Sequence, residues 1–168
     1  MLSPVQARAR EHKTTASQAP IIMSGDDAKI LRLWQERIGE IEPGDLRDHW
    51  PVQLGSYLES FVLDWHERKT RFELTERGKF VAHPALDNIG ATLDSYRPID
   101  DSVVEVKVCG GWQPLNDIVA HYTPQVIVQM RCRQSAHGAL LVVHGGAEPQ
   151  EIPIVPDPNY EQIGRAHV

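Results

Sequence analysis

One short segment of this 168-residue chain holds the residue types best suited to chemistry. Glu105 and Lys107 stand two positions apart in the run 103–108, which has the pattern of a β-strand. Residues two apart in a strand point to the same face, so these side chains would project together while the valines beside them face a core. Asp94, near the end of the preceding predicted strand, would place a second carboxylate beside Glu105. Two carboxylates repel each other, and a divalent cation bound by hard oxygen ligands relieves that repulsion.

Two further groups extend this chemistry. Lys107 could stabilise an attacking hydroxide or the charged transition state of a phosphate transfer. Glu59 lies at the border of the apolar stripe of a predicted helix and could complete the acidic cluster, directly or through water. In the alternative interpretation, Glu105 and Lys107 form the solvated face of a half-exposed strand, because the pattern Glu-x-Lys often arises by chance. The residues alone leave both interpretations open.

The period of the apolar residues predicts the elements that must position these groups. The predicted helices cover residues 24–39, 52–69 and 123–134. The predicted strands lie at residues 90–96, 103–108, 139–144 and 151–155, with a hairpin around residues 76–78. Asp26 or Ser24 can cap the first helix, and Thr123 with Pro124 has the pattern of a helix start. This order of elements predicts an α/β (α+β) fold.

The two ends of the chain differ in composition from the middle. Residues 1–21 are polar and are expected to form a flexible arm, with contact between its basic residues and an anionic partner as the alternative. Residues 22–161 are expected to form one folded domain. Residues 162–168 match one translated frame of a common sequencing adapter. We therefore expect them to be non-native and the natural protein to continue past about residue 161.

Composition narrows the class of protein. The chain has 17 Lys and Arg against 23 Asp and Glu, and its net charge of −6 argues against a basic protein that coats nucleic acid. Its apolar runs are too short to span a membrane. Cys109 and Cys132 are too few for a disulfide scaffold or a four-cysteine metal site, and no signal-peptide pattern precedes them. We therefore expect reduced thiols in a cytoplasmic protein.

Six segments of the chain resemble a set of ordered motifs. They are residues 33–46 with Trp34, Gly39 and Pro43, residues 52–55 with Glu59, residues 90–94, residues 104–107, Tyr122-x-x-Gln125 with Gln129, and residues 140–146. In this order they resemble the YqaJ-type viral recombinases, relatives of the phage lambda exonuclease within the PD-(D/E)xK nuclease superfamily. The likeness covers about residues 22–160. It departs at Leu93 and Ser95, where the family usually has a small residue or proline and a glycine, and this departure removes no ligand.

The resemblance implies a restriction-endonuclease-like core, with a central mixed β-sheet flanked by helices, and a metal-dependent DNA nuclease. The expected activity is a 5′-to-3′ exonuclease that prepares single strands for phage-type recombination. Asp94 and Glu105 would bind Mg²⁺, with Mn²⁺ as a substitute, and the Val106 carbonyl would be a further ligand. Lys107 would position or activate the attacking water, and Glu59 would be a supporting acid.

The third predicted helix completes the implied site. Gln125 would orient the catalytic groups, with Tyr122 near it. Gln125, Gln129 and Arg133 stand at i, i+4 and i+8 on one helix face, which suits contacts with phosphate and water. The alternative is the ordinary polar outer face of a core helix.

Two rival functions use the same residues. An endonuclease of the same fold would cut within a strand, and a non-catalytic protein would only hold DNA or a recombination partner. Besides DNA, the resemblance implies a single-strand annealing protein and further copies of the chain as partners, and no membrane.

Overall fold

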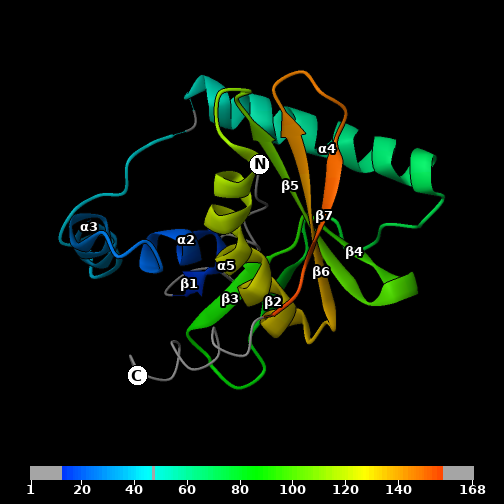
Figure 1. Ribbon diagram of the computed structural model, residues 1–168. Helices are drawn as coiled ribbons and strands as arrows, with labels where there is room; N and C mark the ends of the chain where they lie inside the picture. The colour runs from blue at the N-terminus through cyan, green and yellow to red at the C-terminus, as the bar shows by residue number, and fades with distance from the viewer. Residues whose placement is uncertain (1–12, 47, 157–168) are drawn as a thin grey trace.

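The computed structural model describes residues 13–46 and 48–156, which form two β-sheets and the helices that cover them (Figure 1). The helices are α2 (Ala19–Ile22), α3 (Asp27–Arg37), α4 (Trp50–Thr70) and α5 (Leu115–Arg133), with 3₁₀ turns η1 (Ala16–Gln18) and η2 (Pro98–Asp100). The strands are β1 (Thr14–Thr15), β2 (Phe80–Ala82), β3 (Ile89–Thr92), β4 (Ser95–Arg97), β5 (Ser102–Cys109), β6 (His137–His144) and β7 (Gln150–Ile154). The predicted α/β class, with mixed sheets flanked by helices, is confirmed.

The larger sheet has the strand order β4-β5-β6-β7 and lies between two helices. Its central pair, β5 and β6, is parallel, and both outer pairs are antiparallel. On one face Val62 and Leu63 of α4 pack with Val104 and Val106, and on the other face α5 packs on Val103 and its neighbours. Fully burying one such side chain stabilises the fold by about 1.5–3 kcal/mol. The alternation along β5 therefore orients Glu105 and Lys107 toward the α5 side.

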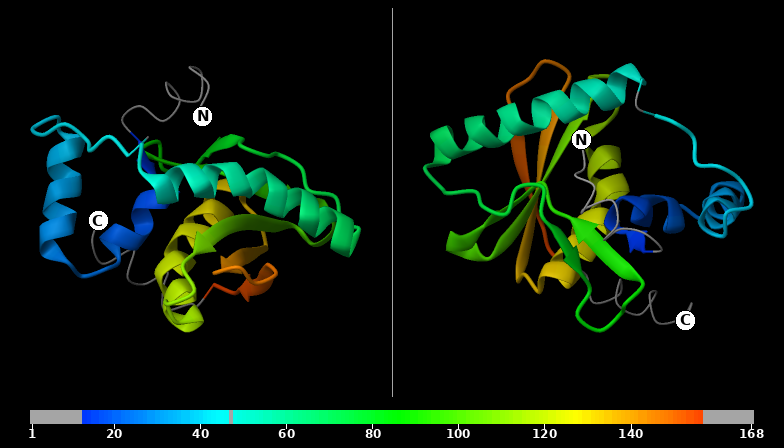
Figure 2. Two further views of the ribbon diagram at one scale, coloured as in Figure 1. Left: turned by 90° about the horizontal axis from the view of Figure 1, so that it is seen from above. Right: turned by 180° about the vertical axis from the view of Figure 1, so that it is seen from behind.

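The first two predicted helices are confirmed. The Asp26 side chain accepts a hydrogen bond from the Lys29 N–H (3.2 Å) and so caps α3 as expected. None of the α3 residues is buried, and the helix stands to the side of the sheets (Figure 2). In contrast, α4 buries Val62, Leu63 and His66 against the larger sheet.

The predicted start of the third helix is wrong. Helix α5 begins at Leu115, eight residues before Thr123, and Pro124 lies inside it. An internal proline costs about 3 kcal/mol because it removes one hydrogen bond and crowds the preceding turn. The earlier turns compensate by burying Ile118, which is 3% exposed, in the core beneath α5. Thr123 is no cap, since its hydroxyl donates to the Val119 carbonyl one turn back (2.7 Å).

The predicted strand at residues 90–96 is split between the two sheets. Its first half, β3, belongs to the smaller sheet, of order β1-β3-β2, and its second half, β4, belongs to the larger one. The turn predicted near residues 76–78 is present, since the Lys79 N–H donates to the Glu76 carbonyl (3.0 Å). The hairpin pairing is wrong, because Phe80 pairs with Thr92 and Thr75 pairs with Tyr96. Both arms of the turn thus pair with the two halves of the split strand.

The N-terminal segment differs from the predicted flexible arm. Thr14 and Thr15 form β1, which pairs in parallel with β3. Ala16 and Ala19 are buried, and Ala16 belongs to the same core as Val103. Residues 13–21 are therefore part of the fold, because their apolar side chains cover the smaller sheet and α5. The remainder of the predicted arm, and the predicted non-native tail at residues 162–168, lie outside the described residues.

Two further predictions from the sequence concern membrane-spanning segments and the cysteines. No helix in the described part of the chain is long and apolar enough to cross a membrane. Cys109 and Cys132 are free thiols, as predicted.

A buried polar network ties α4 to the larger sheet. Arg97 in β4, 6% exposed, donates to Asp100 (2.7 Å), to Glu151 of β7 (2.8 Å) and to Nε2 of His66 (3.3 Å). Burial lowers the pKa of His66, the Glu151 charge raises it in part, and the Arg97 guanidinium lowers it further. Neutral His66 therefore accepts the Arg97 hydrogen bond in the folded state.

This network predicts a pH-dependent stability. Since the pKa of His66 is lower in the folded than in the unfolded chain, the unfolded chain binds more protons. The contribution of His66 to the free energy of unfolding should be largest above a pH of about 6.5. It should fall as the pH drops toward the lower pKa that His66 has in the folded chain. Urea unfolding between pH 8 and 5.5 measures this slope. His66→Gln should flatten it and His121→Gln, at an exposed histidine, should not; equal slopes for all three proteins would contradict the assignment.

Candidate active site

The candidate site forms where the pairing between β4 and β5 ends. The last register pair of this ladder is Ser95 with Val104. Two residues further along β5 the Val106 N–H finds no β4 backbone, and it donates instead to Oδ2 of Asp94 (2.8 Å). Leu93 is already paired elsewhere, with its N–H on the Lys79 carbonyl. The N–H and C=O of one strand residue face the same side, so the Val106 carbonyl also faces Asp94.

Glu105 is a buried carboxylate with three donors. Its side chain is 2% exposed. Oε1 accepts from Lys107 Nζ (2.6 Å) and from Gln125 Nε2 (2.5 Å), and Oε2 accepts from Gln129 Nε2 (2.5 Å). The two glutamines lie one turn apart on α5, which is why both reach one carboxylate. Hydrogen bonds to a charged group are stronger than neutral ones, and here they offset the cost of burial.

Lys107 is held between an acid and an aromatic ring. Its Nζ lies 2.6 Å from Oε1 of Glu105 and 4.7 Å from the ring centre of Tyr122. Burial lowers the pKa of Lys107, but the negative charges of Glu105 and Asp94 outweigh it, so the pKa is raised. The amine is therefore a charged donor. It can position or stabilise an anionic oxygen, and it is a poor proton acceptor.

Two other acids bear an unfavourable negative charge. The pKa of Asp94 is raised well above its ordinary value by burial, by Glu105 and by Glu59. Burial and the Glu105 charge also raise the pKa of Glu59, which is half-buried on α4. The positive charge of Lys107 lowers both values but does not cancel the excess. The site therefore carries an excess of negative charge that an added cation would offset.

The donor chemistry of the site fits Mg²⁺. Within the described residues no three His, Cys, Asp or Glu side chains converge as a metal-binding group. The available oxygens are the carboxylates of Asp94 and Glu105 and the Val106 carbonyl, while Glu59 acts on them through its charge. Mg²⁺ is commonly held by one or two carboxylates and keeps several waters. Such a set of hard oxygens therefore suits it without a third acid.

Gln129 has one unsatisfied atom. Its Nε2 donates to Glu105 and to the Thr92 carbonyl (3.1 Å). Its Oε1 is buried and accepts no hydrogen bond from the described residues. Such an acceptor suits a bound water or a ligand hydroxyl.

Arg133 is not brought to this site. Its Nε lies 2.9 Å from Oε2 of Glu76, and its guanidinium lies 4.2 Å from the ring centre of Tyr96. Along a helix, i to i+8 is about 12 Å, so Arg133 shares the predicted face with Gln125 but lies beyond the reach of Glu105. The other residues predicted for the site, including Gln129 and Tyr122, are gathered around Glu105 and Lys107.

Sequence reasoning missed one neighbour of the site on β5. Cys109 continues the period-two alternation of Glu105 and Lys107 and is half-buried. Burial raises the pKa of its thiol, and the charge of Lys107 lowers it in part. The same alternation that indicates Glu105 and Lys107 would have found this residue.

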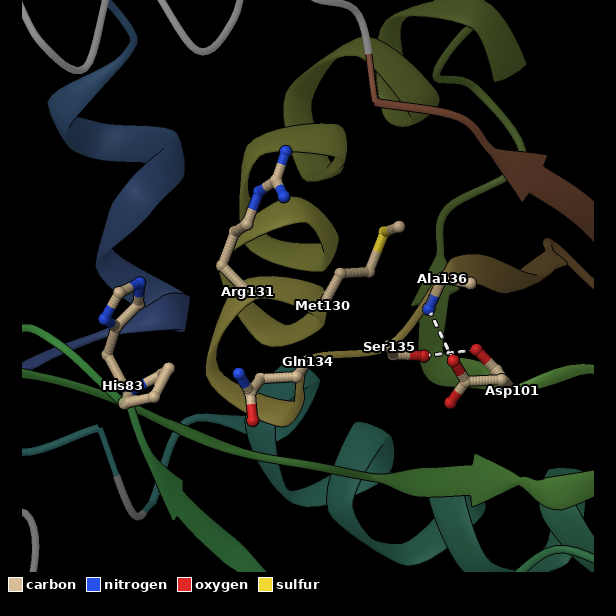
Figure 3. Close-up of a pocket in the computed structure, with 8 residues that line it drawn as sticks. His83, Asp101, Met130, Arg131, Gln134, Ser135 and Ala136 are labelled. Carbon is tan, nitrogen blue, oxygen red and sulfur yellow. Dashed lines mark hydrogen bonds between the residues drawn. The ribbon is translucent and has the colours of Figure 1, made fainter.

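A separate cavity of about 410 Å³ lies at the C-terminal end of α5 (Figure 3). There the Ala136 N–H donates to Oδ2 of Asp101 (2.8 Å) and the Ser135 hydroxyl donates to the Asp101 carbonyl. None of the residues around Glu105 lines it. Its hydrogen bonds join the ends of β5 and β6, so we assign it a structural role.

A family model for the YqaJ-like viral recombinase domain matches residues 7–136. The chain belongs to this family. The match includes every residue gathered around Glu105, and it extends into the N-terminal segment that forms β1.

Solved structures share the fold of this YqaJ-like protein. The alkaline exonuclease LHK-Exo from Laribacter hongkongensis is 19% identical, with a TM-score of 0.75, over 95% of this chain and 85% of that one. The complex of LHK-Exo with dAMP has a TM-score of 0.70. A phage-related exonuclease from Haemophilus somnus 129PT is 11% identical, with a TM-score of 0.66, over 89% and 87% of the two chains. No curated protein matches the chain by sequence.

The charge excess at Asp94 predicts opposite effects of one substitution with and without metal. Asp94→Asn keeps an acceptor for the Val106 N–H but removes a carboxylate whose ionised form is disfavoured. Without metal it should raise the unfolding temperature at pH 8. Mg²⁺ at about 100 times its Kd should stabilise the wild type by about 2.7 kcal/mol, and the variant much less.

Thermal unfolding with EDTA and with Mg²⁺ measures both effects. Asp87→Asn, at an exposed position outside the site, is the matched control and should behave as the wild type. A wild type that gains no stability from millimolar Mg²⁺ would count against the metal site.

Proposed function

We propose that this YqaJ-like protein is a Mg²⁺-dependent nuclease that hydrolyses DNA phosphodiester bonds. We further propose that it works as a 5′-to-3′ exonuclease that generates single strands for recombination. The observation that carries the proposal is the convergence of Asp94, Glu105 and Lys107 at the point where β4 leaves β5. Family membership and the fold shared with exonucleases support it.

Asp94, Glu105 and the Val106 carbonyl would hold Mg²⁺, with Mn²⁺ as a substitute. When bound, such a cation polarises the phosphate and lowers the pKa of water. The glutamines at 125 and 129 fix the Glu105 carboxylate in one orientation, because each donates to a different oxygen. A rigid carboxylate needs little reorganisation during the reaction.

The remaining polar groups act on the substrate and the water. The Lys107 ammonium would donate to an oxygen on which negative charge develops, since its raised pKa keeps it charged. The free Oε1 of Gln129 would accept a hydrogen bond from the attacking water. Glu59, whose pKa is raised, would hold a proton closer to neutral pH as the supporting acid.

The net charge of −6 is compatible with a DNA substrate. Three of the acids, Glu59, Asp94 and Glu105, lie around the site and would be offset by a bound cation. DNA responds to the local field of the cation and Lys107 more than to the average charge of the molecule.

Substrate geometry tests the exonuclease assignment. Linear duplex DNA, labelled at either end and carrying or lacking a 5′-phosphate, is incubated with the protein in Mg²⁺ beside closed-circular DNA. The proposal expects loss of the 5′-end label first and an intact circle. Cutting of the circle would instead indicate an endonuclease. Binding without any degradation would indicate a non-catalytic DNA-binding protein.

Removal of the lysine tests the chemistry itself. Lys107→Ala should lower the rate of DNA degradation by a factor of about 100 or more, because the charged donor to the reacting phosphate is lost. Lys69→Ala is the matched control, since Lys69 is half-exposed and pairs with Glu148 away from the site. Degradation rates in Mg²⁺, with far-ultraviolet circular dichroism to verify folding, measure the effect. Equal rates for the two variants would contradict the role of Lys107.

A further inference from the structure

The turn after β5 carries a tryptophan that the proposed mechanism leaves unused. Trp112 is 84% exposed. It lies in a tight turn in which the Gln113 N–H donates to the Gly110 carbonyl (3.3 Å). The turn joins the strand of Glu105 and Lys107 to the start of α5, the helix that supplies Gln125.

The backbone of this turn is fixed by contacts with the end of β6. The Gly145 N–H donates to the Cys109 carbonyl (2.8 Å), and the Nε2–H of His144 donates to the Gln113 carbonyl (2.7 Å). The backbones of Gly111 and Gly145 pack against each other, since a Cβ added to Gly145 would lie 3.3 Å from the Gly111 Cα. Trp112 is therefore presented to solvent by a well-anchored turn.

The indole itself is also oriented. A Cβ added to Gly110 would lie 2.5 Å from Nε1 and 2.9 Å from Cδ1 of Trp112. The pyrrole edge of the ring thus rests where Gly110 has no side chain, while most of the ring stays in water. Single exposed apolar residues are common on protein surfaces. An indole that is both exposed and seated against a glycine already has a defined position and needs little ordering when it binds.

The position of this indole relates it to the candidate site. Trp112 lies five positions after Lys107, a chain length of at most about 18 Å, and the turn shortens the actual span. The β5 face that carries Lys107 continues to Cys109, directly before the turn. On α5, Tyr122 contacts Lys107 and stacks edge-on with His121. If a DNA strand has one phosphate held at Lys107, a base within a few nucleotides of that phosphate can therefore reach the indole.

We propose that Trp112 is a stacking platform for a DNA base that flanks the phosphate held at Lys107. Stacking on an aromatic ring accepts any base, because every base has a π-face. This role suits a nuclease that degrades strands irrespective of sequence. The inference rests on the proposed function, since it requires DNA at the site.

Anisotropy titration with labelled DNA tests the proposal, with Ca²⁺ in place of Mg²⁺ to limit cleavage. One DNA is a 5′-phosphorylated duplex with a short unpaired end, and the other is the same DNA with abasic residues at its last four positions. Trp112→Ala should weaken binding of the first DNA about tenfold, the change expected for one stacked base. Trp112→Phe should recover most of the affinity. With the abasic DNA, wild type and Trp112→Ala should bind equally.

Two further variants control for structure. Ile99→Ala removes an exposed apolar side chain of η2, at the end of β5 opposite the Trp112 turn, and should bind both DNAs as the wild type does. Gly110→Ala should displace the indole while retaining it, and should weaken binding of the first DNA only.

The outcomes separate this inference from the proposed function. If the wild type degrades linear DNA but Trp112→Ala binds both DNAs with unchanged affinity, the stacking proposal alone is overturned. An equal loss of affinity for intact and abasic DNA would also overturn it, because the effect would not depend on a base. A wild type that neither binds nor degrades DNA overturns both proposals.

Discussion

A negative charge buried in the middle of a β-sheet governs the arrangement of this molecule. Glu105 stands between buried valines on the central strand β5 and is itself 2% exposed. An isolated carboxylate in such a place would be strongly destabilising. Donors from two elements compensate it, namely Lys107 on the same strand and the pair Gln125 and Gln129 on α5. The same hydrogen bonds therefore hold α5 on the sheet and set the geometry of the site.

The second constraint is the interruption of the strand that leads to Asp94. The chain passes from the smaller sheet to the larger one between β3 and β4, and the Asp94 carboxylate replaces the backbone acceptor that the Val106 N–H would have had. The residues that flank the turn at 76–79 pair with the two halves of this strand, Phe80 with Thr92 and Thr75 with Tyr96, and so keep the halves apart. The fold thus places Asp94 beside Glu105 despite their mutual repulsion, which a bound cation would relieve.

The donors around Glu105 do not neutralise the negative charge of the whole site. Lys107 supplies one positive charge near Glu59, Asp94 and Glu105, but burial and the remaining negative charge still raise the pKa values of Glu59 and Asp94. On the opposite face of the sheet the balance differs. There Arg97 is surrounded by Asp100 and Glu151, and the nearby histidine, His66, is held neutral. One network favours an additional cation, and the other ties α4 to the sheet.

Local pattern determined much of this protein. The alternation in residues 103–108 placed Glu105 and Lys107 on one face, the apolar stripe of residues 52–69 predicted α4, and ordered motifs indicated the YqaJ-like family. These features depend on neighbours within a few residues, so the chain itself encodes them. Tertiary structure decided where α5 begins, how the strand at residues 90–96 divides between sheets, and that β1 joins the fold. It also directed Arg133 away from Glu105, because its partner Glu76 comes from a segment distant in sequence that no local period records.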